Sequence, residues 1–165
     1  MRELWRPIDG FPDYSVSSYG NIRSQKSGRI LRLSENQYGL VMVGMMKDGL
    51  QRHRSVPLLV ARAFISPPPG PFDTPINLDG DRRNNHVENL TWRPHWFAVR
   101  YNRQFYRRYP NSIHNPIQDV KTKEVCENSF ECAKRYGLLE EDLVLSILNR
   151  TYVWPTYQEF RVLEE

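Results

Sequence analysis

Arginine and aromatic side chains are concentrated between residues 93 and 109, where five arginines and six aromatic residues occur. Trp96, Arg100, Arg103 and Arg107 are spaced i, i+4, i+7 and i+11, which predicts that they share one face of a helix. Guanidinium groups on such a face suit phosphates and guanine edges, and aromatic rings can stack on bases. The alternative is a helix whose aromatic residues fill a core while its arginines are only solvated.

Carboxylate and amide side chains form a second polar group, between residues 79 and 89. Asp79 and Asp81 are weak candidates for a metal site, because carboxylates bind divalent cations. An Asp-Gly-Asp sequence more often forms a turn in which the carboxylates accept hydrogen bonds from backbone amides, and we favour that interpretation. Three asparagines are expected to fix the turns between a strand and a helix: Asn84, Asn85 and Asn89.

The segment 76–92, INLDGDRRNNHVENLTW, resembles the HNH endonucleases of phages and their homing relatives. The family pattern is roughly Asn/Asp-His-x-Asp-Gly, then Asn-Asn, then Glu-Asn-Leu-x-Trp. Segments 5–8, 14–17 and 20–24 resemble the small domain that often precedes such nucleases. Residues 116–165 resemble the helix-turn-helix repeats that often follow them. The resemblance implies a ββα-metal unit within a chain of several modules.

The catalytic positions of that family are mostly replaced in this sequence. In the family, a histidine acts as general base, and one divalent ion stabilises the scissile phosphate. Aligned on the Asp-Gly pair, the chain has Asn77 at the histidine position, and Ile76 and Ala98 at the two metal-ligand positions. An amide takes no proton from water at neutral pH, and Ile and Ala offer no donor atom. Only Asn89, which orients the histidine in the family, is retained, so the active site is predicted to be degenerate.

Three histidines are available to substitute for the missing base: His53, His86 and His95. Each is expected to be an ordinary surface or DNA-facing residue. No catalytic residue is therefore assigned, and no cofactor is expected. Mg²⁺ is expected only if nuclease activity is retained.

The elements that would position these residues predict an α+β fold in three segments. Residues 1–55 predict a small β-rich domain, and residues 56–110 an HNH-like ββα unit with a basic helix. Residues 111–165 predict a hairpin followed by a helix-turn-helix-like pair. The Asp48-Gly49 dipeptide predicts a hairpin turn, and Pro57 suits the first turn of a helix that ends before residue 67.

The last segment predicts short elements around a glycine. Residues 116–120 and 124–126 are expected to pair as a hairpin. Ser129 is expected to cap a helix that Gly137 ends, because serine is a favoured N-cap residue. The next helix, over residues 140–148, has three residues as its predicted apolar stripe: Leu143, Ile147 and Leu148. Residues 159–163 predict a final strand.

Charge is unevenly distributed along the chain. Residues 1–115 carry 17 basic and 9 acidic side chains, and residues 116–165 carry 6 and 10. The basic first segment indicates a polyanionic partner. The acids of residues 140–142 would repel phosphate, so a protein partner suits the last segment equally well. The candidate DNA-contacting residues are Arg23, Arg52, Arg54, Arg82, Arg83, Arg93, Trp96, Arg100, Arg103, Arg107 and Arg108.

Composition excludes several classes of protein. The two cysteines, Cys126 and Cys132, are too few for a disulfide scaffold or a four-cysteine zinc site. No apolar run approaches the ~20 residues that cross a bilayer, and the first residues lack the apolar stretch of a signal peptide. We therefore expect no membrane partner and a cytoplasmic protein, in the host cytoplasm if the chain is phage-encoded.

The leading functional prediction is binding of double-stranded DNA without hydrolysis. Two alternatives remain open from the sequence. The first is an active Mg²⁺-dependent endonuclease with a rearranged site. The second is an adaptor that binds a phage or host protein through the acidic last segment.

Overall fold

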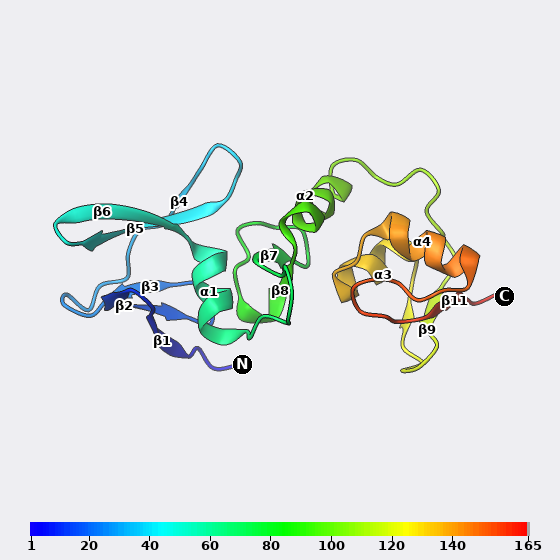
Figure 1. Cartoon of the computed structure of the whole chain (residues 1–165), viewed down its shortest axis with the longest axis horizontal. Coiled ribbons are helices and arrows are strands. Elements are labelled where there is room, and N and C mark those ends of the chain that lie inside the picture. The colour runs from blue at the N-terminus through cyan, green and yellow to red at the C-terminus, as the bar shows by residue number, and fades with distance from the viewer. Residues whose placement is uncertain (165) are drawn as a thin grey trace. The chain divides into compact units, whose positions relative to one another are not determined.

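The structure, a computed structural model, describes residues 1–164 and has an α+β fold (Figure 1). Its strands form four small sheets within the described residues, so the predicted fold class is confirmed. The chain divides into two compact units, residues 1–77 with 81–95, and residues 78–80 with 96–164. That division falls inside the predicted middle segment, and the three-segment organisation stays a prediction.

The first sheet of unit 1 is antiparallel, in the order β1-β2-β3. Its strands are β1 (Trp5–Ile8), β2 (Phe11–Ser17) and β3 (Ile22–Ser24). Val16 and Ile22 lie opposite each other on β2 and β3, and both are fully buried. Ser15 and Ser17 of β2 are buried as well, so side chains on both faces of this strand are covered near its end.

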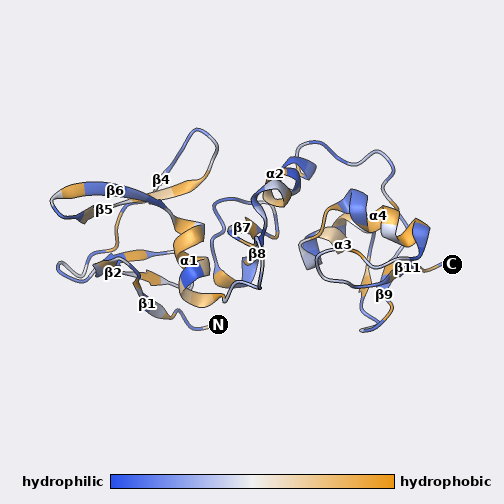
Figure 2. Ribbon diagram, in the orientation of Figure 1, coloured by the Kyte–Doolittle hydropathy of each residue, from blue (hydrophilic) through white to orange (hydrophobic). Residues whose placement is uncertain are grey.

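The second sheet of unit 1 presents a basic edge strand. Its strands are β4 (Ser34–Glu35), β5 (Val41–Lys47) and β6 (Leu50–Ser55). Asp48 and Gly49 both have positive φ and join β5 to β6, as a two-residue hairpin turn requires. Alternate residues of β5 reach the core, whereas β6 is exposed over most of its length and hydrophilic in its middle (Figure 2).

Helix α1 (Val56–Phe64) packs its apolar face on this core. It begins at Val56, and the Ser55 side chain caps it by accepting a hydrogen bond from the Leu58 amide. Pro57 lies in the first turn, where its missing N–H costs nothing. None of the helices within residues 1–164 is long and apolar enough to cross a membrane.

Two short strands frame the motif segment. β7 (Thr74–Asn77) pairs with β8 (Leu90–Arg93), which places Asn77 opposite Leu90. The chain between them folds as turns and one 3₁₀ turn, Val87–Asn89. The Trp92 indole donates a hydrogen bond to the Ile65 carbonyl at 2.8 Å and ties β8 to the end of α1.

Helix α2 (His95–Gln104) is shorter than the basic stretch predicted. It buries Phe97, Ala98, Tyr101 and Gln104 on one side. After Gln104 the chain turns, so the prediction that Arg107 extends the helical face is wrong. The residue before Pro110 is disfavoured in the helical conformation, which agrees with a helix that stops before that proline.

The rest of unit 2 is a three-stranded sheet with two helices. The strands are β9 (Ile117–Asp119), β10 (Val125–Cys126) and β11 (Phe160–Val162), and the helices are α3 (Ser129–Tyr136) and α4 (Glu140–Asn149). The predicted hairpin is confirmed as β9 and β10. Gly137, in the left-handed conformation, ends α3 as expected.

Two predictions about these helices are wrong. Asn128, not Ser129, caps α3, since its side chain accepts a hydrogen bond from the Glu131 amide. Leu148 is 69% exposed and does not belong to the buried face of α4, where Val144 is buried instead.

Candidate nucleic-acid interface

The asparagines of the motif form a closed network in unit 1. Asn77 is 4% exposed, and its amide nitrogen donates to the Asn84 carbonyl at 2.8 Å and to Asn85 Oδ1 at 2.9 Å. Asn89 donates to the same Asn84 carbonyl at 2.8 Å. At the position of the family's histidine, the chain therefore has a buried amide that holds the loop together.

The positions that would hold a metal do not fit one. Ile76 is 1% exposed and Ala98 is 4% exposed, so each is a buried hydrocarbon side chain in its own unit. Asp81 Oδ1 accepts a hydrogen bond from the Arg83 amide at 2.9 Å, as in a turn, while Asp79 is exposed. Within residues 1–164, no three His, Cys, Asp or Glu side chains cluster as a metal site would require.

His86 is engaged in the same loop. Its Nδ1 accepts a hydrogen bond from the Glu88 amide at 3.2 Å, and its ring lies 4.6 Å from that of Tyr19. A neutral imidazole has one acceptor nitrogen, so this bond occupies the lone pair that a general base would use. His53 and His95 are exposed.

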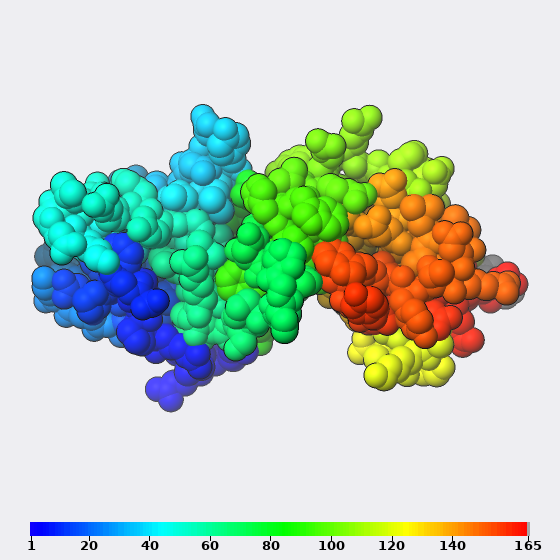
Figure 3. All heavy atoms as spheres, viewed as in Figure 1, coloured from blue at the N-terminus to red at the C-terminus, as the bar shows by residue number. Residues whose placement is uncertain are grey.

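The β5–β6 hairpin exposes a row of basic residues. Arg52, His53 and Arg54 follow one another on β6, and all three are exposed. The Arg54 guanidinium lies 5.2 Å from the centre of the Phe11 ring, and Lys47 Nζ lies 5.3 Å from it. The space-filling view shows the hairpin, in cyan, at the surface of unit 1 (Figure 3).

Other predicted arginines have partners within unit 1. Arg23 lies 4.2 Å from the centre of the Trp5 ring. Arg82 donates to the Tyr38 carbonyl at 2.6 Å, and Arg83 pairs with Glu35 at 2.6 Å. Arg93 is only 7% exposed and donates to the Trp92 carbonyl at 2.7 Å.

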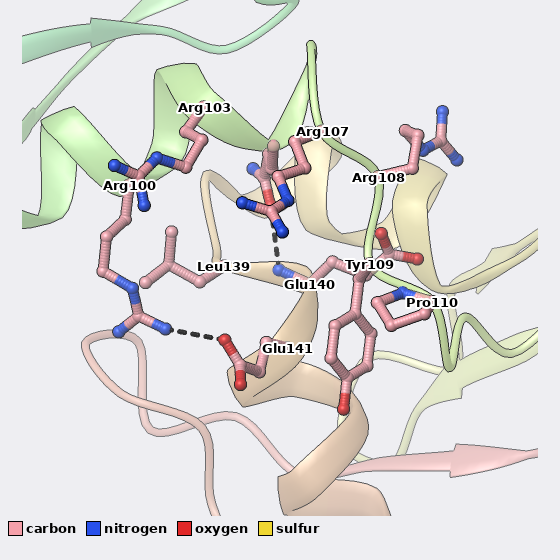
Figure 4. A pocket seen from close by; sticks show the side chains of 10 residues that line it. Arg100, Arg103, Arg107, Arg108, Tyr109, Pro110, Leu139, Glu140 and Glu141 are labelled. Atoms are coloured by element: carbon pink, nitrogen blue, oxygen red, sulfur yellow. Dashed lines mark hydrogen bonds and ion pairs between the residues drawn. The ribbon is translucent and has the colours of Figure 1, made fainter.

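The remaining predicted arginines gather around a pocket of unit 2, about 360 Å³ in volume (Figure 4). The pocket lies between α2, the turn that follows it and the start of α4. Its lining residues are Arg100, Arg103, Gln104, Arg107, Arg108, Tyr109, Pro110, Leu139, Glu140 and Glu141.

The four arginines of this pocket differ in what they contact. Arg100 pairs with Glu141 at 3.0 Å and with Asp142 at 3.6 Å. The Arg108 guanidinium carbon lies 3.4 Å from the centre of the Phe130 ring. Arg103 and Arg107 are exposed, and their guanidinium groups make no hydrogen bond or ion pair with any described residue.

The pKa of Asp142, which lies beside Arg100, differs from its ordinary value. Burial raises the pKa of Asp142 above its ordinary value, and the adjacent Arg100 guanidinium partly offsets that rise. Glu141 and Asp142 of α4 thus pair with an arginine of the same unit, while Glu140 is buried.

Two residues that sequence analysis did not single out build the pocket wall. Gln104 donates to the Leu138 carbonyl at 3.1 Å and accepts from the Glu140 amide at 3.0 Å. Glu140 is 1% exposed, and its Oε1 accepts from the Ser129 hydroxyl at 2.6 Å. Its Oε2 is buried and has no hydrogen-bond partner among the described residues. No local pattern in the sequence indicates these contacts, because the residues are far apart along the chain.

Trp96, 52% exposed, also has a partner that the sequence did not indicate. It stacks on Trp154 with ring centres 5.5 Å apart and 19° between the planes. One face of the Trp96 ring is therefore covered within unit 2.

Comparisons with known proteins relate this chain to HNH endonucleases. Residues 3–45 match the family model of the NUMOD4 motif, which is found in HNH endonucleases. Two uncharacterized HNH endonucleases of Acanthamoeba polyphaga mimivirus are 35% identical over 92 residues and 33% identical over 94 residues. These matches cover 56% and 54% of this chain, and 27% and 23% of the relatives.

A solved structure extends the likeness to nearly the whole chain. It is that of the HNH homing endonuclease I-HmuI, described for DNA binding and cleavage, with a TM-score of 0.54 and 22% identity. The match covers 98% of this chain and 99% of that one. At this identity the likeness concerns the fold.

The chain thus has HNH endonucleases among its relatives, and the resemblance drawn from its motif is confirmed. It spans about a quarter of the length of the two curated relatives. The helix-turn-helix assignment, the phage origin and the degenerate site stay predictions.

Proposed function

We propose that this chain binds double-stranded DNA through its exposed arginines and does not hydrolyse it. The scaffold would be that of an HNH nuclease whose catalytic positions serve the fold.

The environment of Asn77 supports this proposal most directly. The amide is buried, and its nitrogen donates two hydrogen bonds to oxygens of its own loop. A general base needs a titratable lone pair within reach of water, and this side chain has none. The buried Ile76 and Ala98 add no metal donor.

The binding half of the proposal rests on exposed cations in both units. Arg52 and Arg54 lie on the exposed strand β6, and Arg103 and Arg107 border the pocket. Arginine is suited to phosphate because its planar group donates several hydrogen bonds in a fixed geometry. Since such binding releases counterions, the affinity should fall steeply with salt.

The test is a titration of the protein against supercoiled plasmid in parallel with Mg²⁺, Mn²⁺ and EDTA. Retarded but uncut plasmid, equally in all three, is the expected result. A double variant, Arg52→Gln/Arg54→Gln, should weaken retardation, whereas the exposed Arg62→Gln on α1 is the matched control. Metal-dependent nicks would overturn the proposal in favour of the rearranged endonuclease.

The adaptor alternative gains less support from the structure. Glu140 is buried, and Glu141 and Asp142 pair with Arg100, so these acids are engaged within unit 2. Absence of any plasmid shift at low salt would nevertheless favour an adaptor.

A further inference from the structure

We propose that the arginine-lined pocket of unit 2 binds a single unpaired nucleotide of a DNA strand. This goes beyond the proposed binding of duplex DNA, because it assigns the pocket a ligand that a fully paired duplex does not offer. The base would enter the pocket, and its phosphate would lie at the rim.

The rim carries the charge that a phosphate needs. Arg103 and Arg107 lie along one edge of the pocket, and their guanidinium groups are not engaged by any described residue (Figure 4). Arg100 and Arg108 are already occupied, by Glu141 and by the Phe130 ring. Two exposed guanidinium groups at the rim are thus available to a phosphodiester.

The walls carry the surface that a base needs. Tyr109 and Leu139 lie on opposite sides of the pocket, and Pro110 adds apolar surface beside the tyrosine (Figure 4). Leu139 is 3% exposed, so its side chain is packed into unit 2 and forms a fixed apolar surface of the pocket. A phosphate gains nothing from an aromatic or aliphatic wall, whereas a base gains stacking from the tyrosine ring.

The floor favours a base over an anion. Glu140 lines the pocket while being 1% exposed, and its Oε2 lacks a hydrogen-bond partner among the described residues. A carboxylate there repels a phosphate that enters deeply.

The size of the pocket sets the number of nucleotides. About 360 Å³ is near the lower end of the volumes that hold small molecules, roughly 300–1,000 Å³. That volume suits one base with its sugar at the mouth. The Gln104 side chain, bonded to both Leu138 and Glu140, keeps the two sides of the pocket at a fixed separation.

The experiment compares three DNA duplexes of one sequence by fluorescence anisotropy at fixed salt. One is fully paired, one carries a central single-nucleotide bulge, and one carries the same bulge as an abasic site. The bulged duplex should bind about tenfold more tightly than the other two, because stacking of one base on an aromatic ring contributes an affinity gain of that order. The abasic bulge has a similar backbone defect, so it separates base recognition from DNA bending.

Variants then assign the preference to the pocket. Tyr109→Leu should abolish the preference for the bulge and leave paired-duplex affinity unchanged, whereas Tyr106→Leu, at a ring 84% exposed and outside the pocket, should keep it. Arg103→Gln/Arg107→Gln should weaken the bulged duplex more than the paired one, which keeps the test valid if Tyr109→Leu fails to fold.

The outcomes separate this inference from the proposed function. Equal binding of all three duplexes would overturn the pocket assignment and leave duplex binding intact. Failure of the paired duplex to bind at low salt would overturn the proposed function. In that case a single-stranded oligonucleotide and its abasic counterpart test the pocket, and equal affinity for the two would overturn the assignment.

Discussion

The asparagine loop, residues 77–89 of the motif, and the arginine pocket are both polar, but they use hydrogen bonds differently. An amide side chain carries both donors and an acceptor. Asn77 donates to the Asn85 side-chain oxygen and to the Asn84 carbonyl, and Asn85 in turn donates to the Arg82 carbonyl. A guanidinium only donates, and Arg103 and Arg107 find no acceptor among the described residues, so their N–H groups are left to solvent or to a ligand. A set of amides can therefore close a network within a fold, whereas a set of arginines needs acceptors from other groups.

Burial follows the same division. Asn77 and Asn85 are each 4% exposed, while Arg103 and Arg107 are exposed. Substitutions in the loop should consequently change the stability of the chain, and substitutions at the pocket rim should change its binding.

The largest effect is expected from Asn77→Asp. The change replaces a buried donor with an acceptor facing the Asn84 and Asn85 oxygens, and should lower the free energy of unfolding by about 3 kcal/mol. Urea denaturation measures the loss, with the exposed Asn111→Asp as control. A change no larger than the control's would mean that the loop network contributes little to stability.

Gly80→Ala should come next, because it disturbs the packing of the motif turn against the segment after α2. Gly80 has φ +79°, and a Cβ there would overlap the Phe105 ring. We expect a loss of about 2–3 kcal/mol from the left-handed backbone and the overpacking together.

Gly28→Ala is the matched control for that substitution. Gly28 also has positive φ, but no atom lies within 4 Å of its added Cβ. The control should cost only about 1 kcal/mol in thermal or urea unfolding, from the backbone alone. Equal losses at the two glycines would show that Phe105 moves away freely.

Arg103→Gln/Arg107→Gln should leave stability within about 0.5 kcal/mol of the original, as surface changes do. The slope of log affinity for duplex DNA against log salt should become shallower, by about 0.9 for each phosphate that the variant no longer neutralises. Anisotropy titrations at several salt concentrations measure the slope, with Arg62→Gln as control. An unchanged slope would mean that other cations, for example those of β6, neutralise the phosphates.

The smallest effect concerns the Arg100–Asp142 pair. Burial raises the pKa of Asp142 and Arg100 opposes the rise, so Arg100→Gln should raise it further. A raised carboxyl pKa means that the folded state binds the proton more tightly than the unfolded state. The contribution of Asp142 to stability therefore falls as the pH rises from its pKa in the unfolded chain to its pKa in the folded chain. Carbon-detected NMR titration of Asp142 reports the shift, and a lowered pKa in the variant would contradict the pairing.

Local sequence determined much of the scaffold. The Asp48-Gly49 turn, Pro57 in the first turn of α1, and Gly137 at the end of α3 were all predictable. Each reflects a backbone preference of one or two residues, which acts without distant contacts. The motif of residues 76–92 likewise carried the resemblance to HNH endonucleases.

Tertiary structure decided which polar residues are engaged. Arg93 and Arg103 look alike in the sequence, yet one is buried against a carbonyl and the other borders a pocket. The pocket itself joins α2 to Leu139 and Glu140, more than thirty residues away, through Gln104. Sequence periodicity reports the face of a single helix, whereas accessibility and hydrogen-bond partners depend on which other element packs against that face.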